Sequence, residues 1–192
     1  IYGHGGIESD IEIQRLLRAA LGACGLSDVR LDIGHVGVYR AIVRSGDVPA
    51  SLEPELLEAL IAKDRPGLDA ATQGLGAATR RALMLLPDLY GGIEVLERAR
   101  KELPRLPEID AALADLAALA ADNGVTMSID LADLRGYHYH SGVVFAAYCS
   151  GLPSAVALGG RYDEVGKAFG RARPATGFSM DLRQLATLAA PG

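Results

Sequence analysis

The stretch that decides the fold reads LRGYHYHSGVVF over residues 134–145, and it is followed by GGRYDE at 159–164 and PATGFSMDL at 174–182. Short apolar runs occupy 125–130, 143–148, 154–158 and 175–180, and turn residues separate them. Runs of this length between turn signals predict β-strands. Because short turns join antiparallel neighbours, we expect an antiparallel sheet with a closing helix over about 181–189 on one face.

Upstream of this sheet, the sequence predicts a helix, a strand and a second helix. An apolar stripe at helical spacing runs through residues 7–23, and Ser9 with Glu12 fits a capping box at its start. Alternation of apolar and polar residues over 29–33 predicts a half-buried strand. Glycines then make a turn into a helix expected over 36–45.

The segment from Pro49 to about Leu119 has a different pattern, because its leucines and isoleucines repeat at four-residue steps. Glycine and proline interrupt the pattern at intervals, which predicts four or five short helices with tight connections. We therefore expect one core over residues 1–192 that is interrupted by a helical insertion at about 49–119.

Composition excludes several classes of function. Hydrophobic residues make up 49% of the chain and charged residues 22%, with no run near the roughly 20 apolar residues of a membrane span. A net charge of −5 disfavours nucleic acid as a partner, although Arg161, Lys167, Arg171 and Arg173 could form a local basic patch. Two cysteines far apart in sequence, without metal-type spacing, suit the reducing cytoplasm. No metal or other cofactor is expected.

The three quoted motifs resemble the catalytic core of histidyl-tRNA synthetase, whose pattern runs RG-L-D-Y-Y-TG-x-VFE, GGRYD and PAxGFxxGxERL in the same order. They are still more similar to the regulatory subunits of ATP phosphoribosyltransferase, a non-catalytic branch of that family. In that branch RGYHYHSGVVFAAY, GGRYDEVG-x-AFGRARPATGF and the upstream LDIGHVGVYRA match almost without change. The resemblance covers nearly the whole chain, and it is weakest in the helical segment.

The resemblance implies an α+β fold of the class II aminoacyl-tRNA synthetase type, an antiparallel sheet flanked by helices. The chain begins with Ile1, so we expect it to be a fragment that lacks the first strands of that core. The resemblance also implies a non-catalytic function in the first step of histidine biosynthesis, with feedback regulation by L-histidine. The implied partners are the catalytic subunit, in a hetero-oligomer, and a second copy of the chain, through the synthetase-like core.

A histidine site is implied by the residues that match the synthetase's amino-acid pocket. Arg135 matches an arginine that contacts the carboxylate of the amino acid, and its guanidinium suits such a contact. Tyr139 and His140 match two tyrosines around the imidazole, and His140 keeps a flat ring with a donor and an acceptor. The other expected members of the site are three glycines, at which backbone can approach a ligand closely, and a tyrosine in the same motif as two of them: Gly159, Gly160, Gly177 and Tyr162.

Each of these candidates also has a purely structural interpretation. Arg135 could be a surface arginine in a salt bridge. The aromatic residues of 137–140 could alternate along a strand, with Tyr137 and Tyr139 on one face and both histidines on the other. His138 and His140 could also form a metal pair, although no third ligand lies nearby in sequence.

One departure from the synthetase pattern bears on catalysis. The arginine that stacks on the adenine of ATP would fall at Gln184, and a neutral amide supplies neither its charge nor its stacking plane. No catalytic residue is therefore assigned. The alternative function is a working histidyl-tRNA synthetase core, which would require that arginine.

Overall fold

The computed structural model describes residues 1–122 and 126–189, with only the backbone described for Ala168, Phe169, Leu188 and Ala189. Six strands form one mixed sheet in the order β2-β3-β1-β4-β5-β6. The strands are β1 (Val29–His35), β2 (Tyr90–Gly91), β3 (Thr126–Asp130), β4 (Val143–Cys149), β5 (Ala157–Arg161) and β6 (Thr176–Met180). Val125, where a strand was expected to begin, lies outside the described residues.

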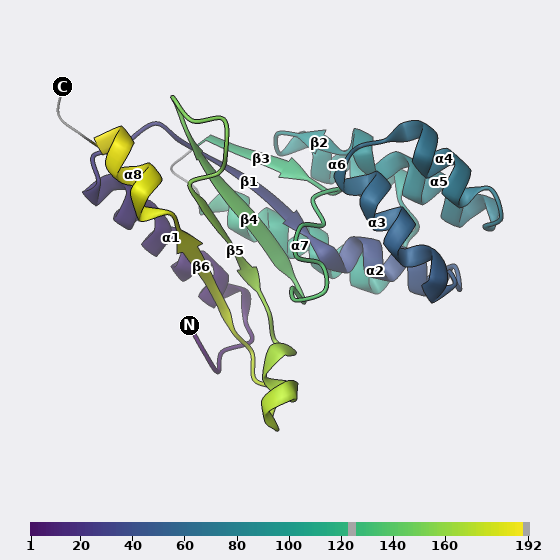
Figure 1. Cartoon of the computed structure of the whole chain (residues 1–192). Helices are drawn as coiled ribbons and strands as arrows, with labels where there is room; N and C mark the ends of the chain where they lie inside the picture. The colour runs from purple at the N-terminus through teal and green to yellow at the C-terminus, as the bar shows by residue number, and fades with distance from the viewer. Residues whose placement is uncertain (123–125, 190–192) are drawn as a thin grey trace.

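The helices fall into two groups (Figure 1). Those that contact strands of the sheet are α1 (Ile7–Ala23), α2 (Val36–Ser45) and α7 (Pro107–Ala121), and α8 (Leu182–Ala189) follows the end of β6. Those gathered at one end of the sheet, away from β5 and β6, are α3 (Glu53–Ile61), α4 (Arg65–Thr72), α5 (Ala77–Leu85) and α6 (Glu94–Glu102). Within the described residues, no helix combines the length and the apolar character needed to cross a membrane.

The sheet confirms the expected α+β class but differs from a purely antiparallel arrangement. β1 pairs with β3 in parallel, with Leu31 opposite Met127, whereas the other pairs are antiparallel. A parallel pair requires a long crossover connection, and here the helices between β1 and β3 supply it. The short β2 was not expected, and β5 begins at Ala157 and reaches Arg161, further than the run at 154–158 suggested.

Two further expectations about the helices can be compared with the structure. Residues 49–119 hold the predicted series of short helices, and Pro54, Pro66 and Pro107 occupy their first turns, where a missing N–H costs nothing. Whether this segment is an insertion stays a prediction, and its last helix, α7, packs against β1 and β4. The capping box was wrong: α1 begins at Ile7, and the Ser9 hydroxyl donates to the Gly6 carbonyl instead.

Candidate functional site

The two faces of the sheet have opposite character. Leu31, Ile33 and Phe145 point to the face that packs on α1 and α7, and each is at most 2% exposed. Arg30 and Asp32 point to the other face, and the strand register places Tyr148 directly opposite Arg30 on it. We call this second, more polar side the open face. The two cavities that contain predicted site residues lie on this face.

A cavity of about 340 Å³ lies on the open face where β5 and β6 meet the loop between β3 and β4. It brings together five of the seven predicted site residues. Its lining consists of His140, Leu158, Gly159, Gly160, Tyr162, Gly177, Phe178 and Ser179. The motifs at 134–145, 159–164 and 174–182, which are far apart in sequence, therefore meet in one place.

Two glycines lie against the His140 ring, one in the cavity lining and one in the loop that carries His140. A Cβ on Gly160 would lie 2.6 Å from the Val143 carbonyl oxygen and 2.7 Å from the His140 ring. Gly136, in the β3–β4 loop, has φ of +65°, and a Cβ there would lie 2.7 Å from His140 Nδ1. The first glycine lets bare backbone approach the His140 ring, and the second combines a left-handed conformation with the same close approach.

The hydrogen bonds of His140 determine what its ring can offer. Its Nδ1 lies 3.2 Å from the Arg135 carbonyl oxygen, and since a carbonyl only accepts, Nδ1 carries the hydrogen. Burial lowers the pKa of His140 below its ordinary value of 6.5, although the Arg135 and Gly136 backbone and Asp133 act in the opposite direction. The ring is therefore neutral near pH 7, and its Nε2, which lies beside Gly160, is a hydrogen-bond acceptor.

Arg135 lines a different cavity of about 250 Å³ on the open face, together with Asp32, Lys63 and Tyr148. Its Nε and Nη2 donate to the two carboxylate oxygens of Asp133 at 2.8 Å and 2.6 Å, and its Nη1 donates to the Tyr148 hydroxyl at 3.2 Å. The hydrogen bonds to Asp133 raise the pKa of Arg135 further. The guanidinium is thus already paired with a carboxylate of the chain, and its side chain remains 41% exposed.

Tyr139 lies outside both cavities, and it is 70% exposed. Residues 135–139 form turns, so the alternative of a strand with alternating aromatic residues is wrong. Tyr137 is buried, whereas Tyr139 is not. Within residues 1–122 and 126–189, no group of three or more His, Cys, Asp or Glu side chains is placed to hold a metal ion.

Arg161, which by sequence could have belonged to a local basic patch, is instead buried. The side chain is only 9% exposed, and its Nη2 donates to Asp10 Oδ2 at 2.6 Å and to the Ser9 hydroxyl at 2.8 Å. It also donates to the Gly6 carbonyl. Arg161 therefore fastens the N-terminal loop and α1 to β5, directly beside the cavity glycines. Its position in the GGRYD motif was the signal available in the sequence.

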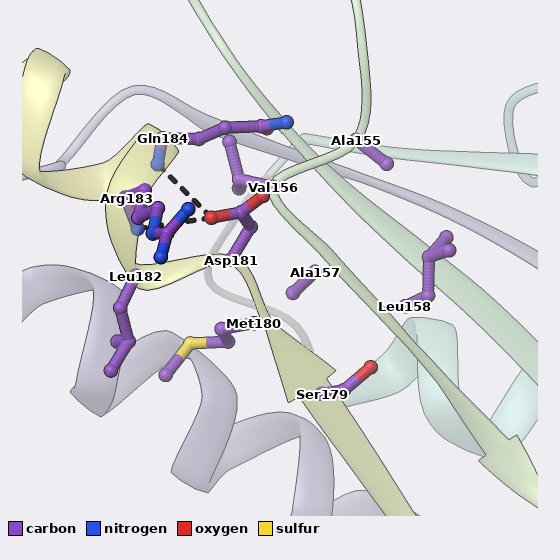
Figure 2. A pocket seen from close by; sticks show the side chains of 10 residues that line it. All are labelled: Ala155, Val156, Ala157, Leu158, Ser179, Met180, Asp181, Leu182, Arg183 and Gln184. Atoms are coloured by element: carbon purple, nitrogen blue, oxygen red, sulfur yellow. Dashed lines mark hydrogen bonds between the residues drawn. The ribbon is translucent and has the colours of Figure 1, made fainter.

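A groove of about 640 Å³, separate from the two cavities above, lies where β6 runs into α8 (Figure 2). Gln184 lines it at the position of the adenine-stacking arginine in the resembled synthetase pattern. Asp181 lies where that pattern has glycine, and its Oδ1 accepts from the backbone N–H groups of Arg183 and Gln184. A carboxylate therefore occupies the start of α8. The neighbouring cation Arg183 lies about 100° around the helix axis from Gln184, so its side chain does not take the place of an arginine at 184.

Comparison with known proteins places these features in a family. The family model of histidyl-tRNA synthetase matches residues 1–185. The chain is 63% identical over 187 residues to an ATP phosphoribosyltransferase regulatory subunit of Ralstonia nicotianae and 62% identical to one of Ralstonia pickettii, covering 97% of this chain in each case. It covers 48% of each relative, so the chain spans about half the length of the curated relatives it matches.

A solved structure from Bacillus halodurans shows the same fold. It is described as an ATP phosphoribosyltransferase regulatory subunit/histidyl-tRNA synthetase, and it superposes with a TM-score of 0.87 at 30% sequence identity. The superposition covers 100% of this chain and 52% of that one. With the fold, the three motifs in one cavity and the family model all in agreement, the chain belongs to the histidyl-tRNA synthetase family.

Proposed function

We propose that this chain is part of a regulatory subunit of ATP phosphoribosyltransferase and that it binds L-histidine as an effector. The observation that carries the proposal is the cavity on the open face, which keeps Gly159, Gly160, Tyr162 and Gly177 together with His140. The high identity to regulatory subunits from two Ralstonia species supports the same function.

The cavity has the chemistry to bind an imidazole. His140 Nε2 can accept a hydrogen bond from a ring N–H, and the flat His140 ring offers a stacking surface. A Cβ on Gly177 would lie 2.9 Å from the Tyr162 hydroxyl, so bare backbone at 177 keeps that hydroxyl free to turn toward a ligand. The His140 Nε2 acceptor, the Tyr162 hydroxyl and the exposed backbone of the glycines together suit the size and polarity of a histidine side chain.

Arg135 is the proposed contact for the carboxylate of histidine, and Tyr139 the second aromatic contact. To act in this way, the Arg135 guanidinium must release at least one of its bonds to Asp133 or share them, which the 41% exposure of its side chain permits. Tyr139 must turn inward from its exposed position. Both movements belong to the β3–β4 loop, which therefore rearranges when the ligand binds.

The groove beside α8 supports a non-catalytic function. Aminoacylation requires ATP, and Gln184 cannot provide the charge and stacking plane of an arginine. The Asp181 carboxylate, which caps the first turn of α8, repels a phosphate from the place where helix N–H groups would otherwise attract one. We therefore propose that the chain performs no chemistry itself.

Regulation then follows from linkage. Histidine can inhibit only if it binds one state of the complex better than another, and that difference in free energy is the coupling. The proposed partners are the catalytic ATP phosphoribosyltransferase subunit, in a hetero-oligomer, and a second copy of the regulatory chain. We place the complex in the cytoplasm, as befits amino-acid biosynthesis, and we expect neither a nucleic acid nor a membrane as a partner.

Calorimetric titration of the full-length protein with L-histidine and, separately, with ATP tests the proposal. Histidine binding without ATP binding is the expected result. ATP binding with heat from adenylation of histidine would instead establish the alternative, an active histidyl-tRNA synthetase core. Absence of histidine binding in the presence and absence of the catalytic subunit would refute the proposed effector.

A further inference from the structure

The loop that carries His140 is held from behind by the helix α2. Arg40 Nη2 donates to the Tyr137 carbonyl at 2.9 Å and to the His140 carbonyl at 2.7 Å. The Arg40 guanidinium also lies over the Tyr137 ring, 4.8 Å from its centroid. A single cation therefore fixes two points of the loop, and the second is the residue whose ring lines the cavity.

A second set of contacts holds the same loop. The Tyr137 ring packs edge-on against Tyr39 of α2 with centroids 5.2 Å apart, and the Tyr137 hydroxyl donates to Glu53 at 2.7 Å. Burial raises the pKa of Tyr137 to about 12, so the hydroxyl stays protonated as a donor. Tyr137 is thus fixed independently of Arg40, whereas the His140 carbonyl is tied to α2 by Arg40.

His140 uses almost all of its polar groups to define its own position. Its backbone N–H donates to the Gly136 carbonyl at 2.9 Å, its ring Nδ1 donates to the Arg135 carbonyl, and its carbonyl accepts from Arg40. The remaining polar atom is Nε2, which lies against Gly160 in the cavity. The direction of Nε2 therefore depends on the three contacts that hold the residue.

We propose that Arg40 is a positioning residue of the histidine site: by holding the Tyr137 and His140 carbonyls, it aims the His140 ring into the cavity. This inference rests on the proposed function of that cavity. It assigns a role in ligand recognition to a side chain on α2 that does not line the cavity, in the upstream VGVYRA segment.

Arg44, one helical turn further along α2, provides a matched control. It has the same side chain on the same helix, but it pairs with Glu108 in an exposed position, and its side chain is 69% exposed. Arg40→Met and Arg44→Met remove the same charge and leave a similar stem, so any difference between them comes from what each guanidinium holds.

Histidine binding by calorimetry gives the first readout. If the loop without Arg40 holds the binding arrangement about a tenth of the time, the apparent Kd rises about tenfold, because the apparent affinity scales with the competent fraction. We expect this rise in Arg40→Met and less than a twofold change in Arg44→Met. Arg40→Lys should recover most of the affinity, because one atom, Nη2, makes both hydrogen bonds and an ammonium can donate to two carbonyls.

The second readout follows the His140 ring itself by NMR titration. The charged or titratable groups that face it are Arg40 from α2, Asp133 from its own loop and Tyr162 from the far side of the cavity. Loss of the Arg40 charge, together with freer access of water to the ring, raises the pKa of His140. We expect that rise in Arg40→Met and an unchanged value in Arg44→Met.

The outcomes separate the two proposals. If wild-type protein binds histidine and Arg40→Met binds it equally well, the inference about Arg40 is wrong and the proposed function stands. If wild-type protein does not bind histidine, the proposed function fails, and the ligand-free NMR titration still tests the loop: an unshifted His140 in a folded Arg40→Met would overturn the positioning role. If Arg40→Met does not fold, Arg40→Gln provides the same test, because it also removes the charge and keeps a polar side chain.

Discussion

Replacing Arg161 with methionine should destabilise the fold far more than the loss of a surface charge would. The side chain of Arg161 is 9% exposed and that of its partner Asp10 is 1% exposed. Methionine keeps the apolar stem but removes the donors at 3.0 Å and 2.6 Å from Asp10 Oδ2. The Ser9 hydroxyl and the Gly6 carbonyl lose the same guanidinium.

The expected magnitude follows from what remains after the substitution. Asp10 Oδ1 already has no hydrogen-bond partner among the described residues, so the variant buries a whole carboxylate without a donor. Removing one member of a buried pair costs about 3–5 kcal/mol in the free energy of unfolding. A domain of this size loses roughly 2–4 °C in Tm per kcal/mol, so the melting temperature should fall by about 6–20 °C.

Thermal and urea unfolding, followed by circular dichroism, measure this loss. Arg65→Met is the matched control, because its pair with Asp88 is about half-exposed on both sides and should contribute less than about 1 kcal/mol. The double variant Arg161→Met/Asp10→Asn has no unpaired buried carboxylate. Its free energy of unfolding should therefore fall by clearly less than the sum of the two single-variant losses. A loss below about 1 kcal/mol in Arg161→Met would refute the reasoning.

Three further predictions concern the cavity. Gly160→Ala should weaken histidine binding at least about tenfold by calorimetry, because its Cβ would displace the His140 ring, whereas Gly74→Ala, with open space around it, should bind normally. Tyr139→Ala should weaken histidine binding about tenfold, because the proposed site turns the Tyr139 ring inward onto the ligand; a change of less than twofold would show that Tyr139 keeps its exposed position in the complex. Folding lowers the pKa of His140, so the unfolded chain binds more protons than the folded chain below about pH 6.5. The free energy of unfolding should therefore fall from pH 7 to pH 5. Urea titrations should show a smaller fall in His140→Gln.

Much of the fold could be predicted from local pattern. The strands around residues 143–148 and 175–180 and the helix at 36–45 follow from periodicity and turn residues, and the structure confirms them. The parallel pairing of β1 with β3 could not be predicted from pattern. It depends on the path of the crossover connection that the helices between β1 and β3 form, and the local pattern of one segment does not determine that path.

The site, too, could be predicted from the sequence only in part. Gly160 and His140 meet because strand register and a left-handed glycine at 136 bring them together, and the motifs that contain them were recognisable. The engagement of Arg135 by Asp133, two residues earlier, depends on side-chain conformation in a turn. Burial of Arg161 depends on Asp10, which is 151 residues away in sequence. Neither partner could be assigned from spacing alone.

The carboxylate at the start of α8 has an evolutionary consequence. The resembled synthetase pattern has glycine at this position and arginine at 184, and this chain has Asp181 and Gln184 instead. Restoring arginine at 184 alone would leave the Asp181 carboxylate bonded to the N–H groups of the first turn. On the proposed non-catalytic function, recovery of ATP binding would therefore need at least two substitutions, at 181 and at 184. On that proposed function, the requirement makes a return to the catalytic branch hard to achieve.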